Sequence, residues 1–289
     1  MNGNERQPGG WIDRLTRIDR RIIFLGVAIA VATPVLVPMG LPVKPTRESI
    51  DFFNAIDTLQ AGDVIVFSFD YGADVRAELD PMSVAIWQHC FEKDLRIVAL
   101  TLYPDGVGIA EQVMGPIAEQ FGKEYGVDYV FLGYNADWSG TMLRMGESFR
   151  KTYPVDQYGR STAEIPLLDH ADRFADTPLL ISLASSAYAE WWVTYVGGKF
   201  GQKIVTGNTA IQAVLIYPFY QSGQVLGFLG GLKGASEYEA LTGRPGAATR
   251  GMDSQSTGHV LMVLFILLGN LAYFAPRRRR GSSGTGRTA

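Results

Sequence analysis

Short, nearly uninterrupted apolar runs alternate along the middle of the chain with segments whose apolar positions recur every three or four residues. The runs are typical of strands buried on both faces, as in parallel sheets, and lie at residues 63–70, 96–103, 128–134, 178–184 and 203–206. The periodic segments favour helices at residues 47–60, 80–93, 109–125, 141–149, 188–200 and 222–241. This alternation predicts an α/β domain, with a Rossmann-like, doubly wound, mainly parallel sheet of about five strands.

A longer apolar segment precedes this domain. Residues 22–43 carry no charge, and about twenty such residues span a ~30 Å hydrocarbon core as a helix. Pro34, Pro38 and Pro42 lie in its second half, so we expect regular helix only to about Val37. A cleaved signal peptide is the alternative, but no clear small-x-small cleavage site precedes Lys44.

A second apolar segment follows the domain at residues 258–276. Tyr273 and Phe274 suit the membrane interface, and four consecutive arginines follow at 277–280. The alternative is a buried core helix, but four arginines directly after an apolar segment are typical of the end of a membrane span. Asn270 lies inside the segment, where its amide is a candidate contact for another helix.

Arginines flank both segments on their outer sides, at positions 6, 14, 17, 20 and 21 and again at 277–280 and 287. Positive tails favour the cytoplasm, so we expect a two-pass protein of the cell membrane with both termini cytoplasmic. The predicted order is a tail (1–21), a transmembrane helix (22–43), an extracytoplasmic α/β domain (44–241), a linker (242–257), a transmembrane helix (258–276) and a basic disordered tail (277–289).

A third uncharged stretch, residues 204–232, is also long enough to cross a bilayer. Polar and turn-forming residues interrupt its middle, and a third span would place the arginines at 277–280 on the wrong side. We therefore interpret it as a buried strand followed by a packed, glycine-rich helix.

Composition narrows the function classes. The net charge is −3, which argues against nucleic-acid binding because phosphate neutralisation needs a basic face. Cys90 is the single cysteine and shares a helical face with Met82 and Ile86, so we expect a buried thiol. Three scattered histidines and the lack of phosphate-loop, nucleophile-elbow and zinc motifs predict no metal, cofactor or catalytic set.

Ligands of open α/β sheets bind at the carboxyl ends of the strands, where the strand order reverses. The first strand borders that reversal in either common order, and the ionisable loop 70–78 follows it. The candidate ligand-binding residues are Asp70, Tyr71, Asp74, Arg76, Asp105 and Asn135. The competing interpretation is a solvated turn, because Asp and Gly are common there for local reasons.

Glycines recur in the last predicted helix, and we expect close packing there, within the domain or between copies. The candidate packing or oligomer contacts are Gly227, Gly230, Gly231, Gly234 and Asn270. A phosphate-binding loop is the less favoured interpretation, since the spacing is helical.

These observations favour a non-enzymatic envelope protein that presents a ligand- or partner-binding α/β domain outside the membrane. Its expected partners are the lipid bilayer and a homo-oligomer or membrane complex. Two alternatives stay open: a membrane-tethered hydrolase using the loop 70–78, and a subunit of a larger membrane complex.

Overall fold

The computed structural model describes residues 19–37 and 39–281, which fall into two compact units. The central unit is Pro42–Thr249, and the described part of the terminal unit comprises residues 19–37, 39–41 and 250–281. The predicted α/β domain, 44–241, lies inside the central unit. The arginines at positions 6, 14 and 17 and the end of the predicted tail, 282–289, lie outside the described residues.

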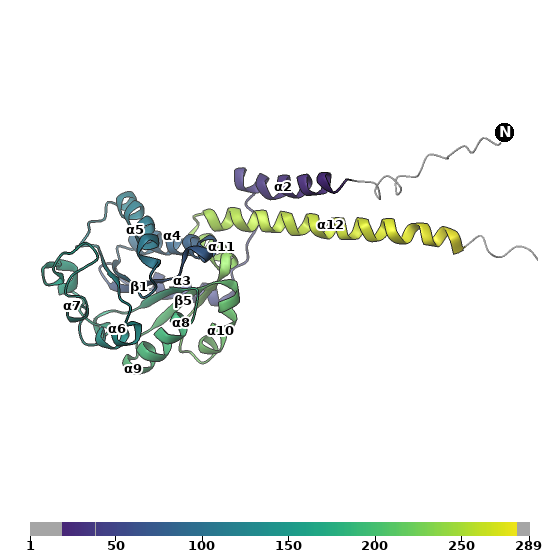
Figure 1. Ribbon diagram of the computed structural model, residues 1–289. Coiled ribbons are helices and arrows are strands. Elements are labelled where there is room, and N and C mark those ends of the chain that lie inside the picture. Colours follow the sequence, from purple (N-terminus) through teal and green to yellow (C-terminus); the bar gives the residue numbers. More distant parts are fainter. Residues whose placement is uncertain (1–18, 38, 282–289) are drawn as a thin grey trace, which may run out of the picture. The chain divides into compact units, whose positions relative to one another are not determined.

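One sheet organises the central unit, and all its neighbouring strands are parallel (Figure 1). Among the described residues it has six strands in the order β3-β2-β1-β4-β5-β6. The strands are β1 (Val64–Asp70), β2 (Arg96–Thr101), β3 (Tyr129–Tyr134), β4 (Leu180–Ala184), β5 (Ile204–Asn208) and β6 (Phe228–Gly230). The parallel α/β prediction is therefore confirmed, and its five predicted strands correspond to β1 to β5.

Helices cover both faces of the sheet, which makes the fold doubly wound (Figure 1). One face packs on α3 (Arg47–Asp57), α4 (Arg76–Glu92), α5 (Gly106–Phe121) and α11 (Gly231–Thr242). The other packs on α6 (Trp138–Arg144), α7 (Phe149–Thr152), α8 (Tyr188–Trp191), η5 (Trp192–Gly197), α9 (Gly198–Phe200) and α10 (Ala210–Gln221).

Three predicted elements differ from the structure. The single helix expected over 222–241 is wrong, because its first half contains β6 and only its second half is α11. The helix expected over 141–149 divides into α6 and α7. The helix expected from Asp80 begins a turn earlier, because the short turn η1 (Ala73–Val75) leads directly into Arg76.

In the terminal unit, α2 (Arg20–Leu36) lies alongside α12 (Ala247–Gly281), and the two run antiparallel (Figure 1). A methyl group built on Gly258 would lie 3.3 Å from Val31, and one on Gly26 would lie 3.9 Å from Phe265. Farther along, the Asp253 carboxylate accepts hydrogen bonds from the backbone N–H groups of residues 39–41, at 2.9–3.1 Å. These contacts make the two terminal segments of the chain one helical pair.

One helix of the described residues, Ala247–Leu271, is long and apolar enough to cross a membrane by length and composition. The fold was expected to have two such helices; the first segment, residues 22–43, does not meet this criterion among the described residues, so the second span stays a prediction. The first segment does form a helix, but α2 has 17 residues and reaches only about 26 Å at 1.5 Å per residue. It ends at Leu36, just beyond the internal Pro34, as the prolines in the sequence predicted.

Both connections into the central unit are held by α11. Glu237 accepts hydrogen bonds from Thr46 N (3.1 Å) and Ser49 Oγ (2.6 Å) at the start of α3. Glu239 accepts from Gly246 N, Ala248 N and Thr249 N at 2.8–2.9 Å, which caps the start of α12. Helix α12 therefore begins within the predicted linker 242–257, and only residues 243–246 separate it from α11.

Candidate functional site

The strand order reverses between β1 and β4. The chain proceeds outward through β2 and β3 on one side of β1, then crosses over to β4 and continues outward through β5 and β6. Asp70 and Ala184 pair at the carboxyl ends of the two central strands. Loops leave both strand ends here, so this edge is where an open α/β sheet places its ligand crevice. The first strand borders the reversal, as the sequence analysis predicted.

Asp70 is fully buried at this edge and holds three elements together. Its Oδ1 accepts from Leu102 N at 2.8 Å, and its Oδ2 accepts from Ser68 Oγ at 2.7 Å and Trp192 Nε1 at 2.8 Å. Burial raises the pKa of the Asp70 carboxyl to about 6, although all three hydrogen bonds favour the ionised form and oppose the rise. In this conformation the side chain fixes β1 to the neighbouring backbone and to η5, so it is neither a solvated turn residue nor exposed to ligand.

The other residues of the loop 70–78 form two groups. Asp74 and Asp105 lie near Gly72 together with Tyr103: a methyl group built on Gly72 would lie 3.0–3.3 Å from all three side chains. Tyr71 OH and Arg76 Nε instead both donate hydrogen bonds to the Asp80 carboxylate, at 3.1 Å and 2.7 Å. Tyr71 is buried beside Ser83, and Arg76 also reaches Gln112. The first group carries the two exposed carboxylates, Asp74 and Asp105.

Asn135 follows β3 and organises the next loop. Its side-chain oxygen accepts from Asp137 N at 3.1 Å, and Asp137 in turn accepts from Gly140 N at the start of α6 and from Arg144. The Arg144 hydrogen bond and the Gly140 N–H lower the pKa of Asp137, so this helix start carries a stable carboxylate. Ligand binding by Asn135 stays a prediction.

Aromatic rings gather beside the reversal, a feature that the sequence analysis missed. The Trp138 and Trp191 rings stack with their centroids 3.9 Å apart, and Tyr195 lies edge-on to Trp138 at 5.5 Å. Tyr188 contacts Trp191 at 4.8 Å and Tyr103 at 6.0 Å. We call these five residues the aromatic cluster; all are partly or fully exposed. They come from α6, α8, η5 and the loop after β2, so flat apolar surface and the Asp74–Asp105 carboxylates adjoin one sheet edge.

A row of buried hydroxyl groups crosses the same face of the sheet. Ser68, Ser182 and Thr206 stand in register on β1, β4 and β5, with Asn208 two residues beyond Thr206. Among the described residues, Ser182 Oγ, Thr206 Oγ1, Asn208 Oδ1 and Tyr153 OH are buried without a hydrogen-bond partner. Buried polar groups normally have partners, so these four atoms are exceptions in the interior. The row ends at Ser68, whose hydroxyl donates to Asp70.

The predicted glycine contacts are close packing positions, although they are spread over the residue before β6, the end of β6 and the first turn of α11 rather than lying in one helix. A methyl group on Gly227 would lie 2.2 Å from Phe52 N, and one on Gly230 would lie 2.9 Å from Ala213. Gly231 has φ +59 and faces Ala210, while Gly234 packs on the Leu229 backbone. All four contacts lie within the central unit. Asn270 is exposed on α12, and its role as a contact stays a prediction.

His89 and Cys90 lie on the other face of the sheet, away from these groups. His89 Nδ1 hydrogen-bonds Tyr238 OH at 2.6 Å, and its Nε2 lies 3.5 Å from Asp57. Burial lowers the pKa of His89 and raises the pKa of the buried Cys90 thiol. Both residues are therefore neutral parts of the core.

Clustered metal ligands and a glycine-rich phosphate-binding loop are the features that would mark a metal or cofactor site in the described part of the chain. No group of three His, Cys, Asp or Glu side chains there could hold a metal ion. The loop after β1 has one glycine, Gly72, and so lacks the glycine-rich turn that receives a dinucleotide pyrophosphate.

Comparisons with known proteins give no relative. No family model matches the chain, and neither the curated proteins nor the solved structures contain a significant match.

Proposed function

We propose that the protein is a membrane-anchored binding protein whose α2 and α12 both cross the bilayer and whose central unit lies outside the cytoplasm. The antiparallel pairing of α2 with α12 carries this proposal. Two antiparallel spans bring Arg20 and Arg21 to the same side as the arginines at 277–280, as the positive-inside rule requires. The shortness of α2 fits a span that uses residues 39–41 to reach the interface, where Asp253 binds their N–H groups.

The central unit, in this proposal, binds a ligand or partner that presents an apolar face to the aromatic cluster. Partly exposed tryptophan and tyrosine rings supply large contact areas and lose little conformational freedom on binding. Asp74 and Asp105 beside Gly72 offer acceptors for hydroxyl or amine groups of the bound molecule. The burial of Asp70 supports binding without catalysis, because its two carboxylate oxygens already accept hydrogen bonds from three donors.

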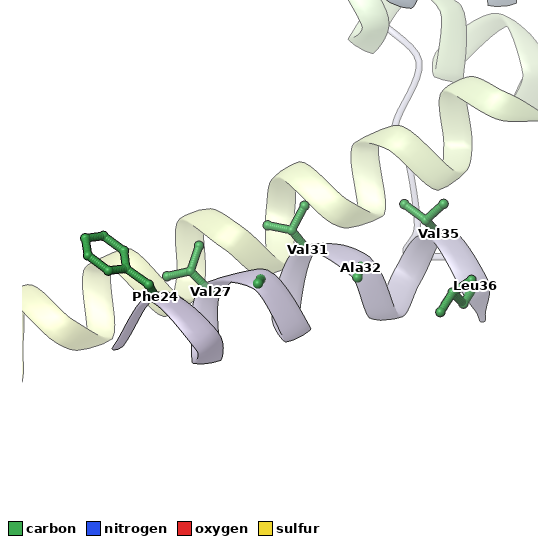
Figure 2. A pocket seen from close by; sticks show the side chains of 7 residues that line it. Phe24, Val27, Val31, Ala32, Val35 and Leu36 are labelled. Atoms are coloured by element: carbon green, nitrogen blue, oxygen red, sulfur yellow. The ribbon is translucent and has the colours of Figure 1, made fainter. Parts of the chain in front are cut away.

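A subunit role in a larger membrane complex has its own supporting observation. An open groove lined only by apolar side chains runs along α2 (Figure 2), formed by Phe24, Val27, Ala28, Val31, Ala32, Val35 and Leu36. Helices in lipid associate through close packing of this kind of surface, in which small residues alternate with larger ones. A further helix bound along this groove would join the anchored protein to others.

Topology is tested in intact cells with an epitope placed after Ala289 and a second inserted after Gly159, in an exposed turn of the central unit. External protease should remove the central epitope and leave the terminal one until the membrane is permeabilised. Cleavage of the terminal epitope in sealed cells would contradict the proposed orientation.

Binding is tested by gentle purification from the native membrane, with quantitative identification of what is recovered. The Trp138→Ala and Trp191→Ala variants should lose the bound molecule while retaining the thermal unfolding temperature of the central unit. Tyr158→Ala is the matched control, because Tyr158 is exposed and packs on Tyr125, outside the aromatic cluster. Equal recovery by all three variants would reject the aromatic cluster as the binding site.

A further inference from the structure

Helix α10 exposes an apolar face. Ile211, Val214 and Leu215 are 83%, 72% and 53% exposed, and their spacing of three and four residues places them on one side of the helix. Its other side packs on the sheet through Ile216, the only fully buried residue of the helix. The sequence analysis interpreted residues 204–232 as a buried strand followed by a packed helix, and it did not predict α10 between them. Exposed contiguous apolar surface of this kind indicates a contact with a membrane or a protein.

The surface also lacks charge, which restricts what it can contact. No Lys, Arg, Asp or Glu occurs between Lys203 and Lys233, whereas α3, another helix of the central unit, carries Arg47, Glu48, Asp51 and Asp57. Tyr217 is 42% exposed on α10 and adds an aromatic ring with a polar end, the kind of side chain that is enriched at bilayer interfaces. An occupant of α10 must therefore bind without ion pairs, through apolar burial and uncharged polar groups.

One neighbour of α10 is the helix that binds both ends of the central unit's chain. Ala210 and Ala213 pack against Gly231 and Gly230 at the start of α11, and Glu78 Oε2 accepts from Ala210 N at 2.9 Å. Helix α11 is the element that binds Thr46 through Glu237 and Thr249 through Glu239. The exposed apolar face thus adjoins the helix that holds both points where the chain enters and leaves the central unit.

We propose that α10 is a membrane-contact helix, which places Ile211, Val214 and Leu215 in the boundary between headgroups and acyl chains of the bilayer that anchors the protein. The inference rests on the proposed anchoring, because a surface without charge needs the anchors to bring it to the lipid. Amphipathic helices that bind membranes without another anchor usually have a basic polar face. Helix α10 has no basic residue and, in this proposal, is held at the membrane by the anchors. Contact should accordingly occur on uncharged lipid and be insensitive to salt.

The test uses the full chain reconstituted in phosphatidylcholine vesicles, with Val214→Cys labelled by an environment-sensitive fluorophore. Cys90 is buried and its thiol is protonated, so the introduced cysteine is the reactive one. Lipids brominated near the headgroup should quench the label several-fold more than in the Val127→Cys control, whose exposed position lies before β3. The same quenching is expected in 50 mM and 500 mM salt, because a contact that involves no charge is not weakened by ionic screening.

Other outcomes overturn the proposal. Equal, weak quenching at both positions in vesicle-bound protein would place α10 in water. Cross-linking between copies at position 214, with a smaller assembly in the Ile211→Ser/Val214→Ser variant, would make a second copy the occupant. Vesicle flotation after a carbonate wash separates these failures from failure of the anchoring: protein that does not float is not anchored, whereas protein that floats but is not quenched rejects only the α10 contact.

Discussion

Trp192 Nε1 donates a hydrogen bond to Asp70 Oδ2 at 2.8 Å, and this contact joins the helix after β4 to the end of β1. The two strands are neighbours at the reversal of the sheet, so the bond fixes the walls of the candidate crevice against each other. The adjacent Trp191 lies in the aromatic cluster. Of these two consecutive tryptophans, one therefore makes an internal hydrogen bond and the other belongs to the aromatic cluster.

Replacing Trp192 with Phe should destabilise the protein by about 1–3 kcal/mol, because a buried carboxylate oxygen loses a donor and the ring leaves a small gap. Urea unfolding of the full chain in detergent at pH 7 measures the change. Trp191→Phe is the matched control and should cost less, since that ring is partly exposed. Equal costs at the two positions would contradict the role given to the Asp70 contact.

The raised pKa of Asp70 predicts a specific dependence of stability on pH. Its folded-state value, about 6, lies above the ordinary value of 3.8, so the folded protein binds more protons between these limits. The contribution of this group is fully present below pH 3.8 and is lost as pH rises through about 6. Asp70→Asn should remove this slope from the unfolding free energy measured between pH 4 and pH 7, whereas Asp74→Asn should retain it.

His89 predicts a dependence of the opposite sign. Burial lowers its pKa in the folded state, so its contribution to stability is present above the unfolded value of about 6.5 and is lost as pH falls through the folded value. His89→Asn should therefore weaken the loss of stability on acidification below about pH 6.5. An imidazole resonance that shifts with a midpoint above 6.5 in the folded protein would contradict this prediction.

Glu239 is expected to keep the start of α12 ordered. Glu239→Gln retains one carbonyl acceptor but loses the carboxylate that serves three backbone N–H groups and Thr249 Oγ1, so we expect a loss of about 1–3 kcal/mol. Hydrogen exchange at residues 246, 248 and 249 should accelerate. Glu147→Gln is the control, because Glu147 is exposed, and unchanged exchange in Glu239→Gln would count against the capping role.

Gly227 tests the close packing predicted for the glycine positions. Gly227→Ala would place a methyl group 2.2 Å from Phe52 N and should cost at least about 1–3 kcal/mol, because backbone on α3 must move. Gly108→Ala is the matched control: no atom lies within 4 Å of the added methyl group, and the residue is in α5. That variant should be neutral or more stable by up to about 1 kcal/mol. Thermal unfolding of both variants decides the comparison.

The sequence predicted β1 to β5 because strands buried on both faces are continuous apolar runs, a pattern that helices with a solvated side do not share. It did not predict β6 or α10. Strand β6 is three residues long and ends in glycine, and α10 is apolar on its exposed side as well as its buried side. Periodicity carries no information where both faces of a helix are apolar, so residues 210–221 were not recognised as a helix.

The candidate site was also predicted only in part from the sequence. Its place at the end of β1 follows from parallel topology, in which the first strand borders the reversal. The aromatic cluster did not follow, because its rings come from residues 103, 138, 188, 191 and 195 and meet only when α6, α8, η5 and the loop after β2 converge. Likewise, the donor that holds Asp70 inside the protein lies 122 residues away along the chain.

By itself, the sequence determined the fold class, the two apolar terminal segments and the edge of the sheet where the candidate site lies, because each depends on local runs of residue types. Only the tertiary structure decided which charges are buried, which rings share a surface and which apolar helix faces outward. Those properties depend on what packs against each residue from distant parts of the chain. Asp70 is buried because Trp192 covers it, and Val214 is exposed because nothing in the central unit does.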